Sequence, residues 1–252
     1  MIRVSFVLPA FNEAGTIGDD IRNIHSSMRD IGLSYEVIVV DDGSTDDTGK
    51  ASEAAGAGVI SHNSNKGVGA ARKTGLRAAR GEIVVMTDAD GTYPTLEVHR
   101  LVERMEGADM VIGARTRETG PRKRLKGIAK YFIRKLACFI AGEEIPDLNS
   151  GFRAFKRDIA MRFMSILPDT HSWVSTITLA FLTNGYRVEY IPIEYRERRS
   201  RSTFHPLRDT VNYVAVVLRI ALLFRPLKII VPAILLMLLL ALVGSVYWTV
   251  LR

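Results

Sequence analysis

The sequence has little cysteine and no ordered set of histidines. Its 252 residues include one cysteine, Cys138, so the chain cannot form an internal disulfide, and this suits a reducing compartment. The five histidines are scattered without the spacing of zinc ligands, and there is no Gly-x-Ser-x-Gly sequence. We therefore expect neither a zinc site nor a histidine-based nucleophilic site.

Charge is missing altogether from residues 229–251, a run of 23 residues. At about 1.5 Å per residue, a helix of this length measures roughly 34 Å, enough to cross a hydrocarbon core of about 30 Å. Arg225 and Lys228 precede the run, and Tyr247 and Trp248 lie near its far end, as at a membrane interface. A buried core helix is the alternative, but core helices rarely run this long without polar residues.

Acidic residues are scarce between positions 115 and 135, where Glu118 is the only one, and the net charge is +7. The basic residues there are Arg115, Arg117, Arg122, Lys123, Arg124, Lys126, Lys130, Arg134 and Lys135. Basic segments beside a spanning helix mark the cytoplasmic side. We expect a single-pass protein of the cell membrane with its soluble domain in the cytoplasm and no N-terminal signal peptide. Nucleic acid is a weaker explanation, because basic and aromatic residues are not interleaved.

Strand-like and helix-like patterns alternate over the first 115 residues. The expected strands are 4–8, 35–40, 58–61, 82–87 and 109–113, and the expected helices are 14–31, 45–55, 67–79 and 94–105. Such alternation predicts an α/β fold, a mostly parallel sheet with helices on both faces.

The pattern is looser after residue 121. It predicts helices at about 123–141, 157–165 and 172–184, and a strand at 186–195. Residues 207–224 carry an apolar stripe typical of an amphipathic helix on a membrane surface. Its members are Leu207, Val211, Val214, Leu218, Ala221 and Leu222. The expected domains are 1–205, the juxtamembrane helix 206–226 and the spanning helix 227–252.

Polar clusters follow the expected strands. They are "PAFNE", "DDGSTDD", "DADGTYP" and "GAR". Ligands of parallel sheets bind outside the carboxyl ends of the strands, so these clusters mark a site.

Asp88 and Asp90 stand one residue apart in the third cluster. Two such carboxylates repel each other unless a cation lies beside them, and Mg²⁺ or Mn²⁺ prefers carboxylate oxygens together with phosphates and water. A solvated turn is the alternative for an isolated pair. The position at a strand end, near other acidic clusters, favours the metal.

The stretch "GVGAARKT" (67–74) resembles a phosphate-binding P-loop, but Arg72 stands where that motif needs glycine. The same residue breaks a Gly-x-Gly-x-x-Gly pattern. We therefore expect an ordinary helix whose small residues pack close to the sheet.

Six stretches in order resemble the family-two inverting glycosyltransferases of the GT-A fold. They are "PAFNE", "VVDDGSTDDT", "NKGVGAARKTG", "ARGEIVVMTDADGTYP", "VIGAR" and "DLNSGFRAF". The chain is similar to dolichyl-phosphate mannose synthases and other polyprenyl-phosphate sugar transferases over roughly residues 2–205. "DADGTYP" resembles archaeal members that start S-layer N-glycans.

The resemblance implies roles for particular residues. The nucleotide-sugar, with GDP or UDP, would contact Pro9, Phe11, Glu13, Val40, Asp42, Asp88, Ala89 and Asp90. Asp88 and Asp90 would hold the metal, and Asp90 and Arg115 would be catalytic. Phosphate or acceptor would contact Arg115, Arg124, Arg199 and Ser202.

The chain departs from the family pattern at two places. Mannose synthases carry a glutamine as a further metal ligand where this chain has Thr92, so mannose and GDP cannot simply be carried over. The family's Ser-Lys-Leu sequence reads Ser202-Thr203-Phe204 here, and Arg198, Arg199 or Arg201 could be the basic residue before it.

The expected activity is transfer of one sugar to a polyprenyl (dolichyl-type) phosphate with inversion. A lipid phosphate is anionic near neutral pH and needs no strong general base, but it needs arginines and a metal against like-charge repulsion. The alternatives are a related enzyme acting on another lipid or on a polysaccharide, and a catalytically silent subunit that binds nucleotide-sugars. No Gln-x-x-Arg-Trp motif of processive synthases is present. The oligomeric state is left open.

Overall fold

A seven-stranded sheet forms the centre of the computed structural model, which describes residues 2–116, 134–196, 215 and 217–250. The strand order is β3-β2-β1-β4-β6-β5-β7. The strands are β1 (Val4–Ala10), β2 (Tyr35–Asp41), β3 (Gly58–Ser61), β4 (Ile83–Met86), β5 (Met110–Arg115), β6 (Arg153–Lys156) and β7 (Val188–Ile193). Only β6 runs antiparallel to its neighbours, β4 and β5. The prediction of a mostly parallel sheet is confirmed.

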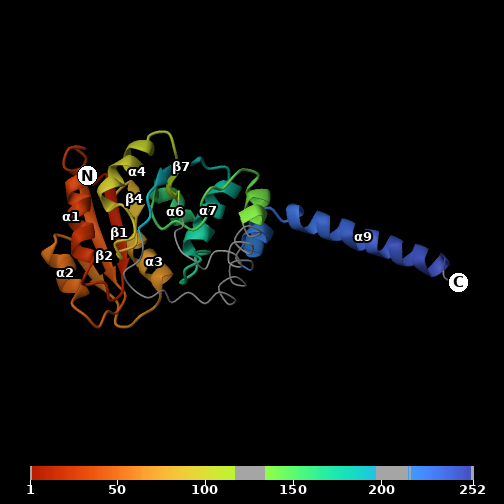
Figure 1. The fold of residues 1–252 in the computed structure, drawn as a ribbon, viewed down its shortest axis with the longest axis horizontal. Helices are drawn as coiled ribbons and strands as arrows, with labels where there is room; N and C mark the ends of the chain where they lie inside the picture. Colours follow the sequence, from red (N-terminus) through yellow and green to blue (C-terminus); the bar gives the residue numbers. More distant parts are fainter. Residues whose placement is uncertain (1, 117–133, 197–214, 216, 251–252) are drawn as a thin grey trace.

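Helices cover both faces of this sheet, as expected (Figure 1). One face carries α1 (Ile17–Met28), α2 (Thr48–Ala54) and α4 (Val98–Arg104), which follows the short 3₁₀ helix η1 (Thr95–Glu97). The other face carries α3 (Val68–Ala78), α6 (Arg157–Arg162) and α7 (Trp173–Thr183). Side chains along β1 point alternately to the two faces: Phe6 and Leu8 enter one core cluster and Val7 enters the other. Both faces are therefore apolar and are covered by helices.

Strand β6 is the element that the sequence did not predict. It is four residues long and lies between β4 and β5, so that Arg153 is opposite both Met86 and Ile112. Ala154 and Phe155 enter the two core clusters on opposite faces. A strand this short, which begins with a fully buried arginine, offers no alternating apolar pattern to read.

A third core cluster joins the described helix 134–141 to α7 and to the helix 217–224. Residues 123–133 and 206–214 of the expected helices lie outside the described residues. In helix 217–224 the buried side chains are Val217, Ile220 and Ala221, whereas Leu222 and Leu223 are 51% and 52% exposed. Of the predicted stripe, Ala221 packs on the domain whereas Leu222 is exposed, and a position of this helix on a membrane surface stays a prediction.

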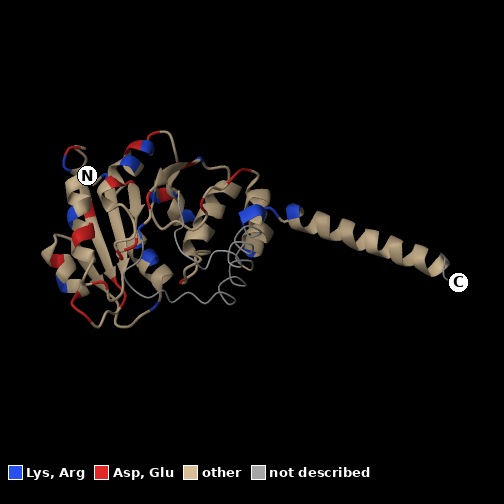
Figure 2. Cartoon of the chain, viewed as in Figure 1, with Lys and Arg blue, Asp and Glu red and all other residues tan. Residues whose placement is uncertain are grey.

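The long apolar helix α9 (Leu227–Val250) extends away from the domain (Figure 1). Its segment Leu227–Thr249 is long and apolar enough to cross a membrane, and none of its most apolar window is buried. Apart from Lys228 at its start, it carries no Lys, Arg, Asp or Glu (Figure 2). The predicted spanning segment is thus a continuous helix, and Pro232 lies in its second turn, close to the end where the missing N–H costs least.

Candidate active site

The polar clusters predicted at the strand ends meet at one edge of the sheet. The parallel strands β1, β2, β4 and β5 end there, and the antiparallel β6 begins there. Gly113 on β5 donates its backbone N–H to the carbonyl of Phe152 at 2.9 Å, just before β6. The segment 149–152 therefore joins the loops after β4 and β5 at the same edge.

Asp88 and Asp90 follow β4 and are oriented by different partners. Asp88 accepts a hydrogen bond from Nη2 of Arg72 at 2.6 Å, and its Oδ2 faces Gly151 so closely that a Cβ there would lie 2.7 Å away. Asp90 is buried, and its Oδ1 accepts bonds from the backbone N–H and the hydroxyl of Thr92 at 3.2 and 2.5 Å. Thr92 thus holds a carboxylate in place.

The residues of this loop fit a divalent cation, for which they would supply only part of the ligand set. Among the described residues no group of three His, Cys, Asp or Glu side chains is arranged around one point, so the aspartate pair offers carboxylate oxygens alone. Negative charge accumulates here: burial chiefly, with a contribution from Asp90, raises the pKa of Asp20 to about 6. Hard oxygen donors in an acidic loop suit Mg²⁺ or Mn²⁺ with phosphate and water as further ligands.

Thr16, which precedes α1, and Asp20 in its first turn hold the aspartate loop and the start of η1 through three hydrogen bonds that the sequence did not reveal. The Thr16 hydroxyl donates to the carbonyl of Ala89 at 2.8 Å. Asp20 accepts from the Gly91 N–H at 3.2 Å and from the Thr95 hydroxyl at 3.0 Å. In the sequence this segment shows only the apolar pattern of a helix. No local motif marks its polar side chains, so their role was not predicted.

Arg72 is a second residue whose role the sequence did not reveal. It lies on α3, the helix expected there, and it is only 4% exposed although it is charged. Besides its ion pair with Asp88, its guanidinium lies over the ring of Trp173 at 5.9 Å. The sequence signal for this role is the position of Arg72 among glycines and alanines, on a helix that packs against the sheet. A buried arginine there needs a buried partner.

Arg115 is placed at the site but is already engaged. Its Nε and Nη2 donate to the two oxygens of Asp147 at 2.6 and 2.9 Å, and its guanidinium lies 5.2 Å from the centre of the Tyr195 ring. Burial alone would raise the pKa of Asp147, but the bonds and charge of Arg115 outweigh this and lower it. Arg115 therefore fastens the 147–151 segment to β5 through a partner that was not predicted.

Tyr93 completes the support of that segment. Its hydroxyl accepts the Gly151 N–H at 2.7 Å, and its ring stacks on Phe152 with centroids 5.8 Å apart. Arg153 is fully buried and donates to the carbonyls of Ser150 and Val174 and to the hydroxyl of Thr178. Burial, followed by the charge of Arg72, lowers the pKa of Arg153 to about 10.

The residues expected to hold the nucleoside lie around the ends of β1 and β2. Pro9 and Val40 are register partners on these strands and are buried. Phe11 is 42% exposed, so its ring is accessible to a base, and Glu13 is half-buried nearby in sequence.

Asp42 is fully engaged in holding its surroundings. Its carboxylate accepts the N–H groups of Lys66 and Gly67 at 2.9 and 2.8 Å and bonds Nδ1 of His62 at 2.6 Å. It thereby ties the loop before α3 to the end of β2. A direct contact of Asp42 with a nucleoside stays a prediction.

Several predicted acceptor residues lie outside the described residues. They are Arg124, Arg198, Arg199, Arg201 and Ser202. Their roles stay predictions.

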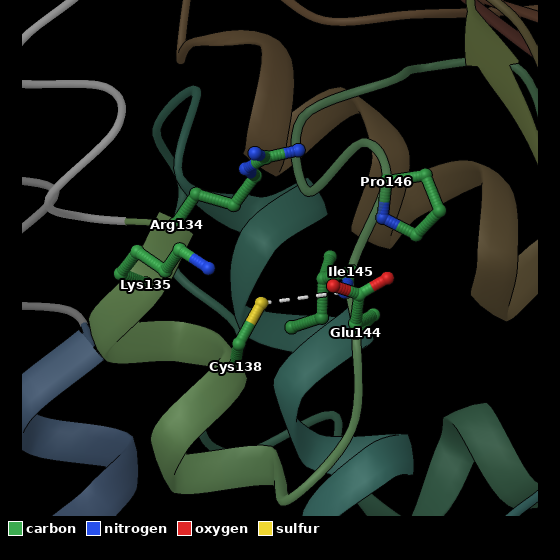
Figure 3. A pocket seen from close by; sticks show the side chains of 6 residues that line it. All are labelled: Arg134, Lys135, Cys138, Glu144, Ile145 and Pro146. Carbon is green, nitrogen blue, oxygen red and sulfur yellow. Dashed lines mark hydrogen bonds between the residues drawn. The ribbon is translucent and has the colours of Figure 1, made fainter.

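A cavity of about 180 Å³ opens next to the Asp147 segment. Figure 3 shows its lining, which is Arg134, Lys135, Cys138, Glu144, Ile145 and Pro146. The Cys138 thiol accepts the Ile145 N–H at 3.3 Å and so ties the helix 134–141 to the loop that leads to Asp147. Two members of the basic stretch thus line a cavity that reaches Pro146, the chain neighbour of Asp147.

Comparisons with known proteins agree with this architecture. The chain is 31% identical over 211 residues to glycosyltransferase AglJ of Haloferax volcanii, covering 82% of this chain and 68% of that protein. It is 30% identical over 233 residues to the polyprenol monophosphomannose synthase of Mycolicibacterium smegmatis, covering 84% and 86%.

A solved structure of glucosyl-3-phosphoglycerate synthase from Mycobacterium tuberculosis with Mn²⁺, UDP and phosphoglyceric acid has a TM-score of 0.68 at 27% identity, covering 87% of this chain and 78% of that one. The same synthase is also solved with Mg²⁺ and UDP. The family model described as glycosyl transferase family 2 matches residues 5–163, more than half of the chain. The chain therefore belongs to glycosyl transferase family 2.

Proposed function

We propose that this protein transfers a sugar from a nucleotide-sugar to a polyprenyl phosphate at a membrane surface, with inversion at the anomeric carbon. The observation that carries the proposal is the combination in one chain of the Asp88–Asp90 loop at the carboxyl edge and the exposed apolar helix α9. The similarity to a polyprenol monophosphomannose synthase over 84% of the chain supports the acceptor class.

Asp88 and Asp90 are the residues that would hold Mg²⁺ or Mn²⁺. The ion would neutralise charge on the departing diphosphate. The protein's own contribution is orientation, because Arg72 and Thr92 each fix one of the two carboxylates and Gly151 leaves room beside Asp88. The related synthase that is solved with Mn²⁺ or Mg²⁺ and UDP supports the use of such a metal.

The acceptor phosphate is the nucleophile in this proposal. One of its oxygens attacks the anomeric carbon, and the bond from that carbon to the donor diphosphate breaks, so the nucleoside diphosphate leaves. An anionic phosphate oxygen needs no strong base, so this step requires no histidine as general base.

Cations must bring the two anions together, and Arg115 is one candidate. Asp147 occupies the Nε–Nη2 edge of its guanidinium. A phosphate bound in bidentate fashion at that same edge would have to displace Asp147. Arg134 and Lys135 line the neighbouring cavity and add positive charge there.

The finer assignments belong to the same proposal. The chain divides into a catalytic domain (residues 1–205), a juxtamembrane helix (residues 206–226) and an anchor (residues 227–252), with the catalytic domain in the cytoplasm. The sugar is mannose or glucose and the nucleotide GDP or UDP, because the departure at Thr92 leaves the choice open.

The deciding experiment is a panel of nucleotide-sugars offered to the full chain in vesicles with polyprenyl phosphate and Mg²⁺ or Mn²⁺. We expect a glycosylated lipid phosphate, detected by mass spectrometry, only with metal present. Phosphoglyceric acid serves as a soluble acceptor control. Transfer to that control alone would overturn the lipid acceptor, and donor binding without transfer or hydrolysis would indicate a silent subunit.

A further inference from the structure

Two helices of the domain end beside the start of the anchor: helix 134–141 and α7. The last carbonyls of an α-helix have no partner within the helix and must be satisfied from elsewhere. The partners they find here come partly from the segment that leads into α9.

Helix 134–141 ends at Gly142, whose φ of +86° is the left-handed conformation of a helix stop. The Gly142 N–H donates to the carbonyl of Cys138 at 2.7 Å. The next two carbonyls, of Phe139 and Ile140, accept hydrogen bonds from Nζ of Lys228 at 2.8 and 3.1 Å. The ammonium also lies 5.6 Å from the centre of the Phe139 ring.

The end of α7 follows the same scheme. Gly185, with φ of +78°, donates to the carbonyl of Leu182 at 3.2 Å. The carbonyl of Thr183, the last residue of α7, accepts from Nε and Nη2 of Arg225 at 3.3 and 3.2 Å. A cation at a helix C-terminus is also favoured by the helix dipole.

Apolar contacts also hold the segment around Arg225 and Lys228 against the domain. Phe224 lies edge-on to Phe163 at 6.0 Å and packs on the second and third core clusters, and Ile229 packs on the third. Figure 2 shows the basic residues gathered at this junction and the uncharged helix beyond it. Only Pro226 and Leu227 lie between Arg225 and Lys228, so the connection between the two caps is short.

We propose that Arg225 and Lys228 dock the anchor rigidly on the catalytic domain by capping two helix C-termini, and so set the height and tilt of the active-site edge above the membrane. The effect on transfer rests on the proposed function, but the docking itself does not. In this view the two cations act as positioning residues, and their contribution is geometric rather than a general attraction to anionic lipid.

The test compares a double variant, Arg225→Gln with Lys228→Gln, with a matched control, Arg219→Gln. Arg219 is an exposed cation on helix 217–224, so its loss lowers the juxtamembrane charge without removing either cap. Spin labels at Leu96→Cys and Leu235→Cys, in a Cys138→Ser background, report the distance between domain and anchor in lipid nanodiscs. Both positions are exposed, and Cys138 is the chain's only cysteine.

We expect a narrow distance distribution in the parent and in the Arg219 control, and a broad one in the double variant. Equal widths in all three proteins would overturn the docking proposal. Widening in the control as well would overturn it too, because general charge would then suffice.

Activity gives the second readout. With vesicle-embedded acceptor, the double variant should lose about tenfold in rate, which corresponds to about 1.4 kcal/mol. With a short, soluble prenyl phosphate, its rate should stay near that of the parent. Equal losses on both acceptors would contradict a positioning role. If the parent transfers to neither acceptor, the proposed function fails, while the distance measurement still decides on docking.

Discussion

Asp90 is buried and is held by two bonds from Thr92. We expect Asp90→Asn to lower the rate of transfer by more than about a hundredfold, because a metal ligand matters at least as much as the groups that orient it. Metal titration of turnover and the thermal midpoint measure this. Asp19→Asn, an exposed carboxylate on α1, is the matched control. Near-normal turnover with an unchanged midpoint would contradict the assignment.

Asp20 predicts a distinct pH dependence. Its pKa is raised from an ordinary 3.8 to about 6 by burial, then by the charges of Asp90 and Asp19, against the bonds from Thr95 and Gly91. A raised carboxyl pKa in the folded state means that the folded protein binds this proton more tightly. The free energy of unfolding should therefore fall as pH rises from about 4 to about 6, by an amount on the order of 2–3 kcal/mol.

The measurement is denaturant unfolding with EDTA across this pH range. Asp20→Asn should remove this contribution to the slope, whatever it does to absolute stability. A variant slope equal to that of the parent would show that Asp20 titrates normally.

Arg115 and Asp147 can be separated by two variants. Arg115→Lys loses the planar fork and should cost about 1–3 kcal/mol of stability, and Asp147→Asn should cost a similar amount, because the pair is largely buried. If Arg115 also binds phosphate, Asp147→Asn should tighten acceptor binding while Arg115→Lys weakens it. Parallel changes in the Michaelis constant for the acceptor would leave Arg115 a purely structural residue.

At the scale of the element, α3 depends on glycine where it crosses the sheet. A Cβ at Gly75 would lie 2.2 Å from Cγ1 of Val7 and 3.2 Å from Cγ2 of Val40. Gly75→Ala should therefore destabilise the protein by about 1–3 kcal/mol through overpacking. Gly15→Ala, where nothing lies within 4 Å, should change little. Chemical denaturation compares them, and equal midpoints would contradict close helix–sheet packing.

Helices and strands that are determined by a short stretch of sequence could be predicted from it. The isoleucines of α1 recur at helical spacing, and β1, β2 and β4 are short, nearly continuous apolar runs, so these elements were predicted within a few residues. The aspartate loop was predicted as well, because a strand end fixes its place. The Asp20 clamp, the Arg72–Asp88 pair and the Asp147 partner of Arg115 join residues 16 to 75 positions apart. Only the fold brings them together.

At the scale of the molecule, the anchor and the catalytic edge are separate. Removing residues 232–252 deletes most of α9 but spares Lys228 and Ile229, which contact the domain. The shortened protein should still bind nucleotide-sugar and metal. It should work poorly on long-chain acceptor in vesicles, because a polyprenyl tail leaves the bilayer at about 0.8 kcal/mol per CH₂. A short prenyl phosphate should restore much of the rate.

Calorimetry of donor binding and the two acceptor assays measure this. Equal rates for full-length and shortened protein on the embedded acceptor would contradict the need for an anchor. Loss of donor binding would make α9 a component of the catalytic fold.

The position of β6 also governs the order in which the chain can assemble. It lies between β4 and β5 but leaves the ribosome after both. Until residue 156 has emerged, the facing edges of these two strands have unpaired backbone groups, which are prone to pairing with other chains. The central sheet therefore closes late in synthesis. Since β6 also carries the 149–152 segment to the aspartate loop, the nascent chain acquires its site in the same step that removes its exposed edges.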